Sequence, residues 1–189
     1  MQQEIEIEGL RLSPQQKRLW LWQQQGHFSL GRAVVTLDGA FDEDAVLAAL
    51  RRVIARHDSL RTTFYRQPGM KVPFQVVHEA GDVDWQVLDL RHLTRDGERE
   101  EALEQVAHRS DAPDWERGPL VRAVFCRWTE THARVLLDIP GLCADAKSLS
   151  NMVAELSRAL DGDPGDLGDD PVQYGQFSEW QHELIEAEE

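Results

Sequence analysis

The sequence predicts an α/β protein of the α+β sandwich type, with a mixed central sheet flanked by helices. Strand-like segments and amphipathic helical segments follow one another without the regular strand–helix repeat of a doubly wound fold. The chain has 189 residues, of which 41% are hydrophobic, so it can bury one sizeable core. These observations favour a single compact unit with a sheet at its centre.

The first half of the chain is expected to contain two helices and a group of strands. Ser13 and Pro14 begin the first helix, because serine is a favoured N-cap and proline fits the first helical position. A strand at residues 32–37 precedes the second helix, which begins at Asp42. The following strands are expected at residues 60–65, 73–77 and 83–88, with a turn at Gln67-Pro68-Gly69 between the first two.

The second half is expected to contain three helices and two strong strands. A charged amphipathic helix is predicted at residues 95–108, and strands at 120–128 and 133–139. The second of these strands is almost entirely apolar, which predicts a central place in the sheet. Helices are predicted at residues 144–160 and about 174–186. The Gly, Asp and Pro residues of 161–171 predict a mobile loop between these helices.

Charge and composition argue against several classes of partner. The formal net charge of -14 leaves no broad cationic surface for nucleic acid. No apolar run approaches the roughly 20 residues of a membrane-spanning helix. Residues 1–12 lack the basic and apolar regions of an export signal, so we expect a cytoplasmic chain with reduced Cys126 and Cys143. The seven histidines have no metal-ligand spacing, so no metal site is predicted.

Four segments share one order and spacing with a known set of motifs. They read LSPQQKRLW at residues 12–20, RHDSLRTTF at 56–64, WERGPLVRA at 115–123 and QYGQFSEWQ at 173–181. In this order they resemble the S-x-A-Q-x-R-L-W, R-H-E-x-L-R-T-x-F, G-P-L-x-R-A and Y-x-D-F-A-x-W motifs of condensation domains of nonribosomal peptide synthetases. The second match is the most specific.

The resemblance implies a particular fold and set of partners. It covers the N-terminal half of a domain built from two chloramphenicol-acetyltransferase-like lobes. Residues 1–171 would then form the N-terminal lobe, and residues 172–189 a helix leading toward the missing C-terminal lobe. The implied partners are peptidyl or acyl carrier proteins and other synthetase domains. Substrates would arrive as thioesters on the phosphopantetheine of the carriers, and no cofactor would be bound directly.

The catalytic motif of the family is altered in this chain. The family motif H-H-x-x-x-D-G aligns with residues 140–146, which read PGLCADA, so both histidines are replaced, by Pro140 and Gly141. Neither side chain can accept a proton, and we assign no catalytic residue among the motif positions Pro140, Gly141, Cys143 and Asp145. A heterocyclising D-x-x-x-x-D motif would need aspartate at position 140, and Asp138 lies two residues too early.

Several residues near the motif have both a functional and a structural interpretation. In the family, the motif aspartate pairs with the arginine of the R-T-x-F segment, which implies a structural pair of Asp145 and Arg61. Cys143 is a candidate nucleophile by its chemistry, but we interpret it as a small buried residue. His57 is interpreted as a structural hydrogen-bonding residue, and the tryptophans as packing rather than a ligand box.

Three functions are compatible with the sequence. The first is a condensation domain that joins carrier-bound aminoacyl or peptidyl groups for natural-product biosynthesis by an atypical or impaired mechanism. The second is a non-catalytic module that recruits a tailoring enzyme or holds neighbouring domains in register, and Pro140 and Gly141 favour it. The third, a freestanding acetyltransferase, also needs the lost histidine. Whether the chain is an enzyme stays open at this point.

Overall fold

The computed structural model describes residues 9–108, 113–161 and 169–187. Residues 1–8, most of the predicted 161–171 loop and the last two residues lie outside the described part of the chain. In chain order the elements are β1 (Leu10–Arg11), α1 (Pro14–Gln23), β2 (Leu30–Asp38), α2 (Glu43–Arg56), the 3-10 helix η1 (Asp58–Arg61), β3 (Thr62–Tyr65), β4 (Phe74–Val77), β5 (Val83–Asp89), α3 (Asp96–Ala107), β6 (Val121–Arg127), β7 (His132–Pro140), α4 (Ala146–Asp161) and α5 (Tyr174–Ala187).

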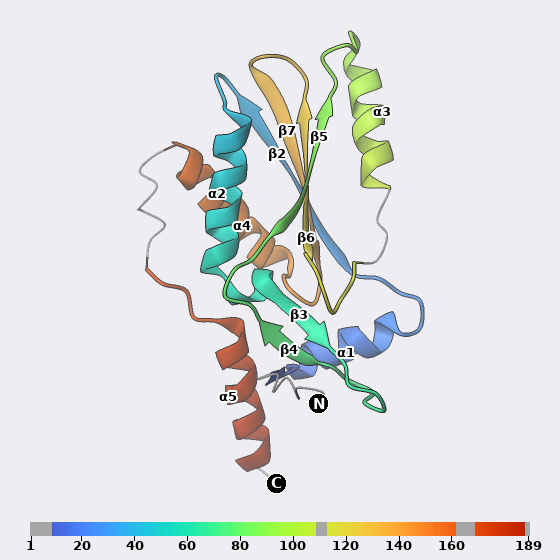
Figure 1. Cartoon of the computed structure of the whole chain (residues 1–189), viewed down its shortest axis with the longest axis vertical. Coiled ribbons are helices and arrows are strands. Elements are labelled where there is room, and N and C mark those ends of the chain that lie inside the picture. The colour runs from blue at the N-terminus through green and yellow to red at the C-terminus, as the bar shows by residue number, and fades with distance from the viewer. Residues whose placement is uncertain (1–8, 109–112, 162–168, 188–189) are drawn as a thin grey trace, which may run out of the picture.

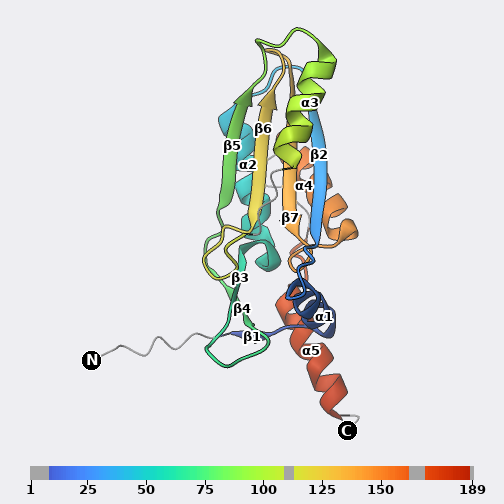
Figure 2. The same ribbon diagram turned by 90° about the vertical axis from the view of Figure 1, so that its right-hand side faces the viewer.

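The larger sheet is the centre of a sandwich. Its strand order is β2-β7-β6-β5, with β5 and β6 parallel and the other pairs antiparallel. Helices α2 and α4 cover one face and α3 covers the other (Figures 1 and 2). The predicted mixed sheet flanked by helices is therefore confirmed, and so is the central place of the apolar strand β7.

A smaller sheet lies at one end of the sandwich, beside α1 and α5 (Figure 1). Its order is β1-β4-β3. The sequence did not predict β1, because a strand of two residues is too short to show an alternating pattern. It also predicted a strand from residue 60, whereas Leu60 and Arg61 belong to η1, where the Leu60 N–H donates to the His57 carbonyl.

The core is divided by the larger sheet into two apolar layers. The main layer joins the sheet to α2 and α4 and includes fully buried Leu50, Phe125 and Leu137. The second layer lies under α3 and includes Leu103, Val124, Cys126, Trp128 and Leu136. Strand residues alternate between the two layers, as the two-residue period of a β-strand requires. Both faces of β7 are therefore covered, which explains its almost unbroken apolar sequence.

A row of charged residues crosses the α3 face of the sheet. Asp138 of β7 lies opposite Arg32 of β2 and Arg122 of β6 in the strand register. Its carboxylate accepts hydrogen bonds from Arg32 Nε at 2.6 Å and Nη2 at 3.0 Å, and Arg122 Nη1 lies 3.7 Å away. Asp138 is only 4% exposed, so its charge is compensated inside the protein by the neighbouring strands.

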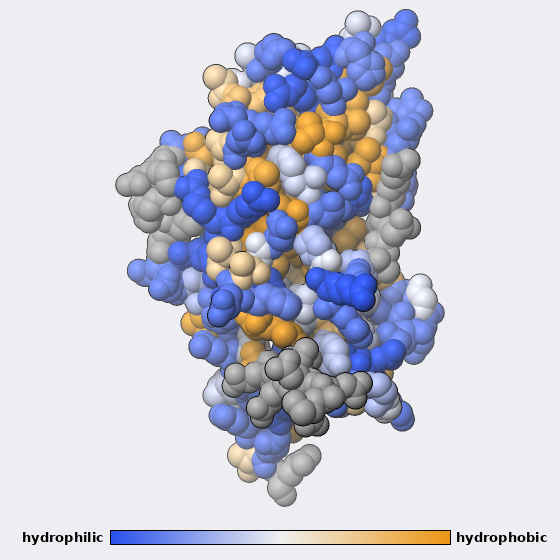
Figure 3. Space-filling view, in the orientation of Figure 1, coloured by the Kyte–Doolittle hydropathy of each residue, from blue (hydrophilic) through white to orange (hydrophobic). Residues whose placement is uncertain are grey.

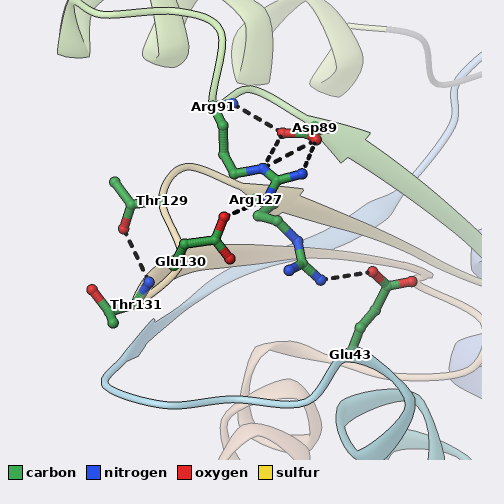
Figure 4. Close-up of polar contacts among 7 residues, drawn as sticks. All are labelled: Glu43, Asp89, Arg91, Arg127, Thr129, Glu130 and Thr131. Carbon is green, nitrogen blue, oxygen red and sulfur yellow. Dashed lines mark hydrogen bonds and ion pairs between the residues drawn. The ribbon is translucent and has the colours of Figure 1, made fainter.

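A second charged cluster lies at the far end of the sheet (Figure 4). Arg91 binds both carboxylate oxygens of Asp89 and also reaches Glu130, while Arg127 donates to Glu43 at 3.1 Å. The hydrogen bonds from Arg91 hold the pKa of Asp89 well below its usual range. Because Asp89, Arg91 and Glu130 are exposed, their ion pairs contribute little to folding stability, whereas the pair of Arg127 and Glu43 is partly buried.

The outer surface is mostly hydrophilic on the face drawn in Figure 3, where apolar residues form separate patches among charged ones. None of the helices in the described ranges combines the length and apolarity needed to cross a membrane. The same described residues contain no group of three or more His, Cys, Asp or Glu side chains arranged to hold a metal ion.

Candidate functional site

The motif loop connects the end of β7 to the start of α4. It folds back on itself, because the backbone N–H groups of Cys143 and Ala144 both donate to the Pro140 carbonyl, at 2.8 and 3.2 Å. Leu142, Cys143 and Ala144 are buried. The loop is therefore a fixed part of the core rather than an open catalytic segment.

Gly141, at the position of the second motif histidine, packs against Ser29. The Gly141 N–H donates to the Ser29 carbonyl at 2.9 Å. A Cβ added to Gly141 would meet the Ser29 hydroxyl and would lie 2.9 Å from the Ser29 Cβ, closer than real Cβ atoms come. Ser29 thus occupies the space into which a side chain at position 141 would begin to extend. The sequence alone did not point to Ser29, because it lies 112 positions before Gly141 in the chain.

Gln16 anchors the loop from the opposite side. Its amide nitrogen donates to the Leu142 carbonyl at 2.9 Å and to the Gln75 side chain at 2.8 Å. Its amide oxygen accepts from the Ser13 N–H, which completes the capping box of α1. The side chain is buried, so these bonds satisfy polar groups that have no access to solvent. This role was not predicted from the sequence, although a glutamine in the first turn of a helix, facing the core, is a usable signal.

The predicted structural pair of Asp145 and Arg61 is wrong. Arg61 instead binds the Asp58 carboxylate and the His78 carbonyl. Asp145 is exposed and caps α4, accepting at 2.7 Å from both the backbone N–H and the hydroxyl of Ser148. These two bonds hold the pKa of Asp145 below its ordinary value. Each of the two residues has a binding partner three positions away in the chain: Ser148 for Asp145 and Asp58 for Arg61. These local contacts are formed in place of the long-range ion pair.

The Cys143 thiol is buried in the loop, not presented to solvent. It is 7% exposed, and burial raises its pKa to about 12. Cys126, on β6, is fully buried, and desolvation raises its pKa to about 11. Since the reactive species is the thiolate, neither residue is poised for nucleophilic attack.

We expect both cysteines to resist alkylation by iodoacetamide at pH 8 while the chain is folded, because for a pKa of 12 only about one thiol in ten thousand is ionised at that pH. Labelling followed by mass spectrometry checks this, and urea should expose both thiols. As pH rises past about 8.5, the unfolded thiols ionise while the folded ones keep their protons, so folding stability should fall. Rapid native labelling of Cys143 would contradict the assignment.

A pocket of about 480 Å³ lies beside the motif loop. This volume falls within the range of roughly 300–1,000 Å³ that is usual for small-molecule sites. The loop, α1, α4 and the start of α5 all contribute to its wall. The lining residues include apolar Leu19, Met152 and Phe177, and polar Gln15, Asn151 and Asp145.

His57 also lines the pocket, but its imidazole ring is engaged by a buried carboxylate of the protein. Its Nε2 lies 2.7 Å from the Glu155 carboxylate, and Glu155 is buried on α4. Gln173, also on the pocket wall, accepts from the Asp58 N–H and donates to the Arg56 carbonyl. The contacts join the C-terminal end of α2 to α4 and to the segment before α5. They agree with the interpretation of His57 as a hydrogen-bonding residue of the framework.

Helix α5 closes one side of the pocket by binding the beginning of the chain. The Tyr174 hydroxyl lies 2.7 Å from the Ser13 hydroxyl, and Ser178 and His182 contact the carbonyls of Arg11 and Leu12. The first and last of the four sequence motifs therefore meet in space. The predicted division at residue 171 falls just before this helix, and the continuation toward a second lobe stays a prediction.

A comparison with family models matches residues 7–189 to the condensation domain. The chain belongs to the condensation-domain family. It is 38% identical over 185 residues to chondramide synthase cmdD of Chondromyces crocatus, covering 92% of this chain and 5% of that protein. Tyrocidine synthase 3 of Brevibacillus parabrevis is 29% identical over 183 residues, which are 94% of this chain and 3% of that protein.

Solved condensation-type structures have the same fold. The X-domain from teicoplanin biosynthesis superposes with a TM-score of 0.79 at 23% identity, over 96% of this chain and 39% of that one. The EpoB NRPS cyclization-docking bidomain of Sorangium cellulosum gives 0.70 at 27% identity, over 90% and 34%. The chain thus spans well under half of these structures, as one lobe of a condensation domain does. The recognised family and the chloramphenicol-acetyltransferase-like fold are confirmed.

Proposed function

We propose that this condensation-type lobe of a cytoplasmic nonribosomal peptide synthetase binds carrier-linked aminoacyl or peptidyl thioesters without itself supplying the proton acceptor for peptide-bond formation. The observation that supports this is the pocket, whose wall includes the motif loop from Gly141 to Asp145. In the family this loop faces the reacting thioester. Its position beside a pocket of sufficient volume supports substrate binding at the same place.

The chemistry of the loop argues for impaired catalysis. Attack of an amine on a thioester leaves the amine with a proton that must be transferred or stabilised. Pro140 and Gly141 have no group for this, and Cys143 is buried with a raised pKa. Asp145 has a lowered pKa, which makes its carboxylate a weak base. We therefore assign substrate binding and positioning to the loop. Peptide-bond formation would then be slow, or would use groups outside this chain.

The test uses one donor carrier protein loaded with an acyl group and one acceptor carrier loaded with an amino acid. We expect the chain to bind loaded carriers but to yield no more peptide product than carriers alone, as measured by mass spectrometry. Asn151→Trp should weaken binding about tenfold or more, because the side chain lies on the pocket wall. Ser150→Trp, exposed on the same helix, is the matched control. Turnover that disappears on replacing Asp145 or Cys143 would contradict the proposal.

A second candidate is a non-catalytic module that recruits a tailoring enzyme or keeps neighbouring domains in register. The replacement of both motif histidines by Pro140 and Gly141 favours this candidate, whereas the pocket beside the loop favours the first. The two candidates differ in the effect of Asn151→Trp within a complete synthetase. A blocked pocket should stop chain extension if the pocket holds cargo. It should leave extension intact, and at most change a later modification of the peptide, if the lobe only recruits another protein.

A further inference from the structure

Asp145 presents its carboxylate on the pocket wall, where the fold binds it only through the first turn of α4. Both hydrogen bonds from Ser148 end on Oδ1. The backbone N–H groups of Lys147 and of Asp145 itself also face the carboxylate and help to lower its pKa. Among the described residues, no ion pair joins the carboxylate to an Arg, Lys or His side chain. Arg61, the partner implied by the family, is held by Asp58. The carboxylate therefore remains charged and open on the pocket wall.

The rest of the pocket wall does not compensate this charge. Among the described lining residues, the titratable side chains besides Asp145 are Tyr174, His57 and Cys143. His57 is engaged by Glu155 and Cys143 is buried. The polar lining residues Gln15, Ser148 and Asn151 are neutral and supply further oxygen acceptors. The pocket thus combines apolar surface with one carboxylate that no cationic side chain of the described lining pairs with, which is complementary to a cationic group on a mainly apolar ligand.

The N-terminus of α4 limits the strength of this attraction. A helix N-terminus carries a partial positive charge of about half a unit, which Asp145 faces as N-cap. The net charge at the pocket wall is therefore about half a negative unit, not a full one. Together with the solvent exposure of Asp145, this predicts a preference for a cation of about threefold to tenfold, not many hundredfold.

We infer that Asp145 recognises the primary ammonium group of an amino acid carried into the pocket as a pantetheine thioester. The inference rests on the proposed function, and it names the substrate class for the same pocket: aminoacyl groups are preferred over acyl groups that lack an amine. In this chain the motif aspartate caps α4 in place of pairing with Arg61, and it also becomes a specificity-determining residue.

The experiment compares two stable ligands, the alanyl and propionyl amides of aminopantetheine, which differ only in the ammonium group. Their dissociation constants are measured by calorimetry at pH 7. We expect the wild-type chain to bind the alanyl ligand about three to ten times more tightly. Asp145→Asn should remove this preference while keeping the helix cap, because asparagine caps helices as well as aspartate does. Higher salt should reduce the wild-type preference.

Matched variants separate the charge at this position from general effects. Glu104→Gln, exposed on α3 and on the other face of the sheet, removes one negative charge elsewhere and should retain the preference. If Asp145→Asn impairs folding, Asp145→Ser retains a capping oxygen and replaces it in the test. Equal binding of the two ligands by the wild-type chain overturns the inference but leaves the proposed function intact. Failure to bind either ligand overturns both, and a preference that survives in Asp145→Asn shows that another group recognises the amine.

Discussion

Asp138→Ala is expected to lower the free energy of unfolding by about 3–5 kcal/mol, because it removes the buried carboxylate that Arg32 binds with two hydrogen bonds and that also lies beside Arg122. Arg32 and Arg122 flank Asp138 on neighbouring strands, and their side chains are 32% and 19% exposed. The hydrogen bond from Arg32 to Asp138 raises the pKa of this arginine, so Arg32 stays charged at any workable pH. The two cations would then repel each other across β7 in a poorly solvated place.

Urea denaturation followed by circular dichroism measures this change. The midpoint should fall while the slope of the transition stays constant, since the surface exposed on unfolding is unchanged. Asp89→Ala, which breaks an exposed ion pair on β5 of the same sheet, is the matched control and should have a much smaller effect. Replacing Arg32, Asp138 and Arg122 together by apolar residues should restore much of the lost stability. A loss below about 1 kcal/mol for Asp138→Ala would show that solvent reaches the arginines freely.

The position of Asp138 also bears on the heterocyclising motif that the sequence analysis set aside. Asp138 points to the α3 face together with Leu136, and it is not among the residues that line the pocket. Its carboxylate is committed to Arg32. A structural role is therefore the better interpretation of this residue, in agreement with its distance in sequence from the expected motif position.

Local signals predicted much of the fold. Ser13-Pro14 and Asp42 mark the starts of α1 and α2, because capping and the first-turn preference of proline act within a few residues. The apolar run of β7 predicted a central strand, since only burial on both faces tolerates such a sequence. These predictions succeed because the physical cause is contained in the segment itself.

Features that depend on distant residues could not be predicted in this way. The separation of the strands into two sheets, and the parallel pairing of β5 with β6, are set by packing between elements. At the site, the contact of Gly141 with Ser29 and the anchoring of Leu142 by Gln16 join segments far apart in the chain. The prediction of an Asp145–Arg61 pair failed because the family pattern indicates only which residue types are present. The contacts themselves are made with nearby residues, Ser148 and Asp58.

Restoring histidine at the second motif position, by Gly141→His, is expected to destabilise the chain by about 1–3 kcal/mol, because the partly buried site is already filled by Ser29. The first atom of the new side chain already collides with Ser29, whose Cβ would be 2.9 Å away. The loop cannot easily move to relieve this contact, because the bond from Gln16 to the Leu142 carbonyl and the bond from Gly141 to Ser29 fix it on both sides.

The same geometry predicts that Gly141→His alone does not create transfer activity. A catalytic base must lie within hydrogen-bond reach of the reacting amine, and a histidine displaced by Ser29 would not be held there. Ser29→Gly removes both atoms of the collision, so the double variant should regain stability, and a double-mutant cycle should give a favourable coupling of about 1 kcal/mol or more.

The measurements are urea denaturation and product formation from loaded carriers. Undiminished stability with new turnover in Gly141→His would show that the loop can open for an imidazole, and that the histidine alone was missing. Independent effects of the two substitutions on stability would instead mean that Ser29 does not hinder the histidine side chain at position 141. Other contacts of the loop would then have to hinder it.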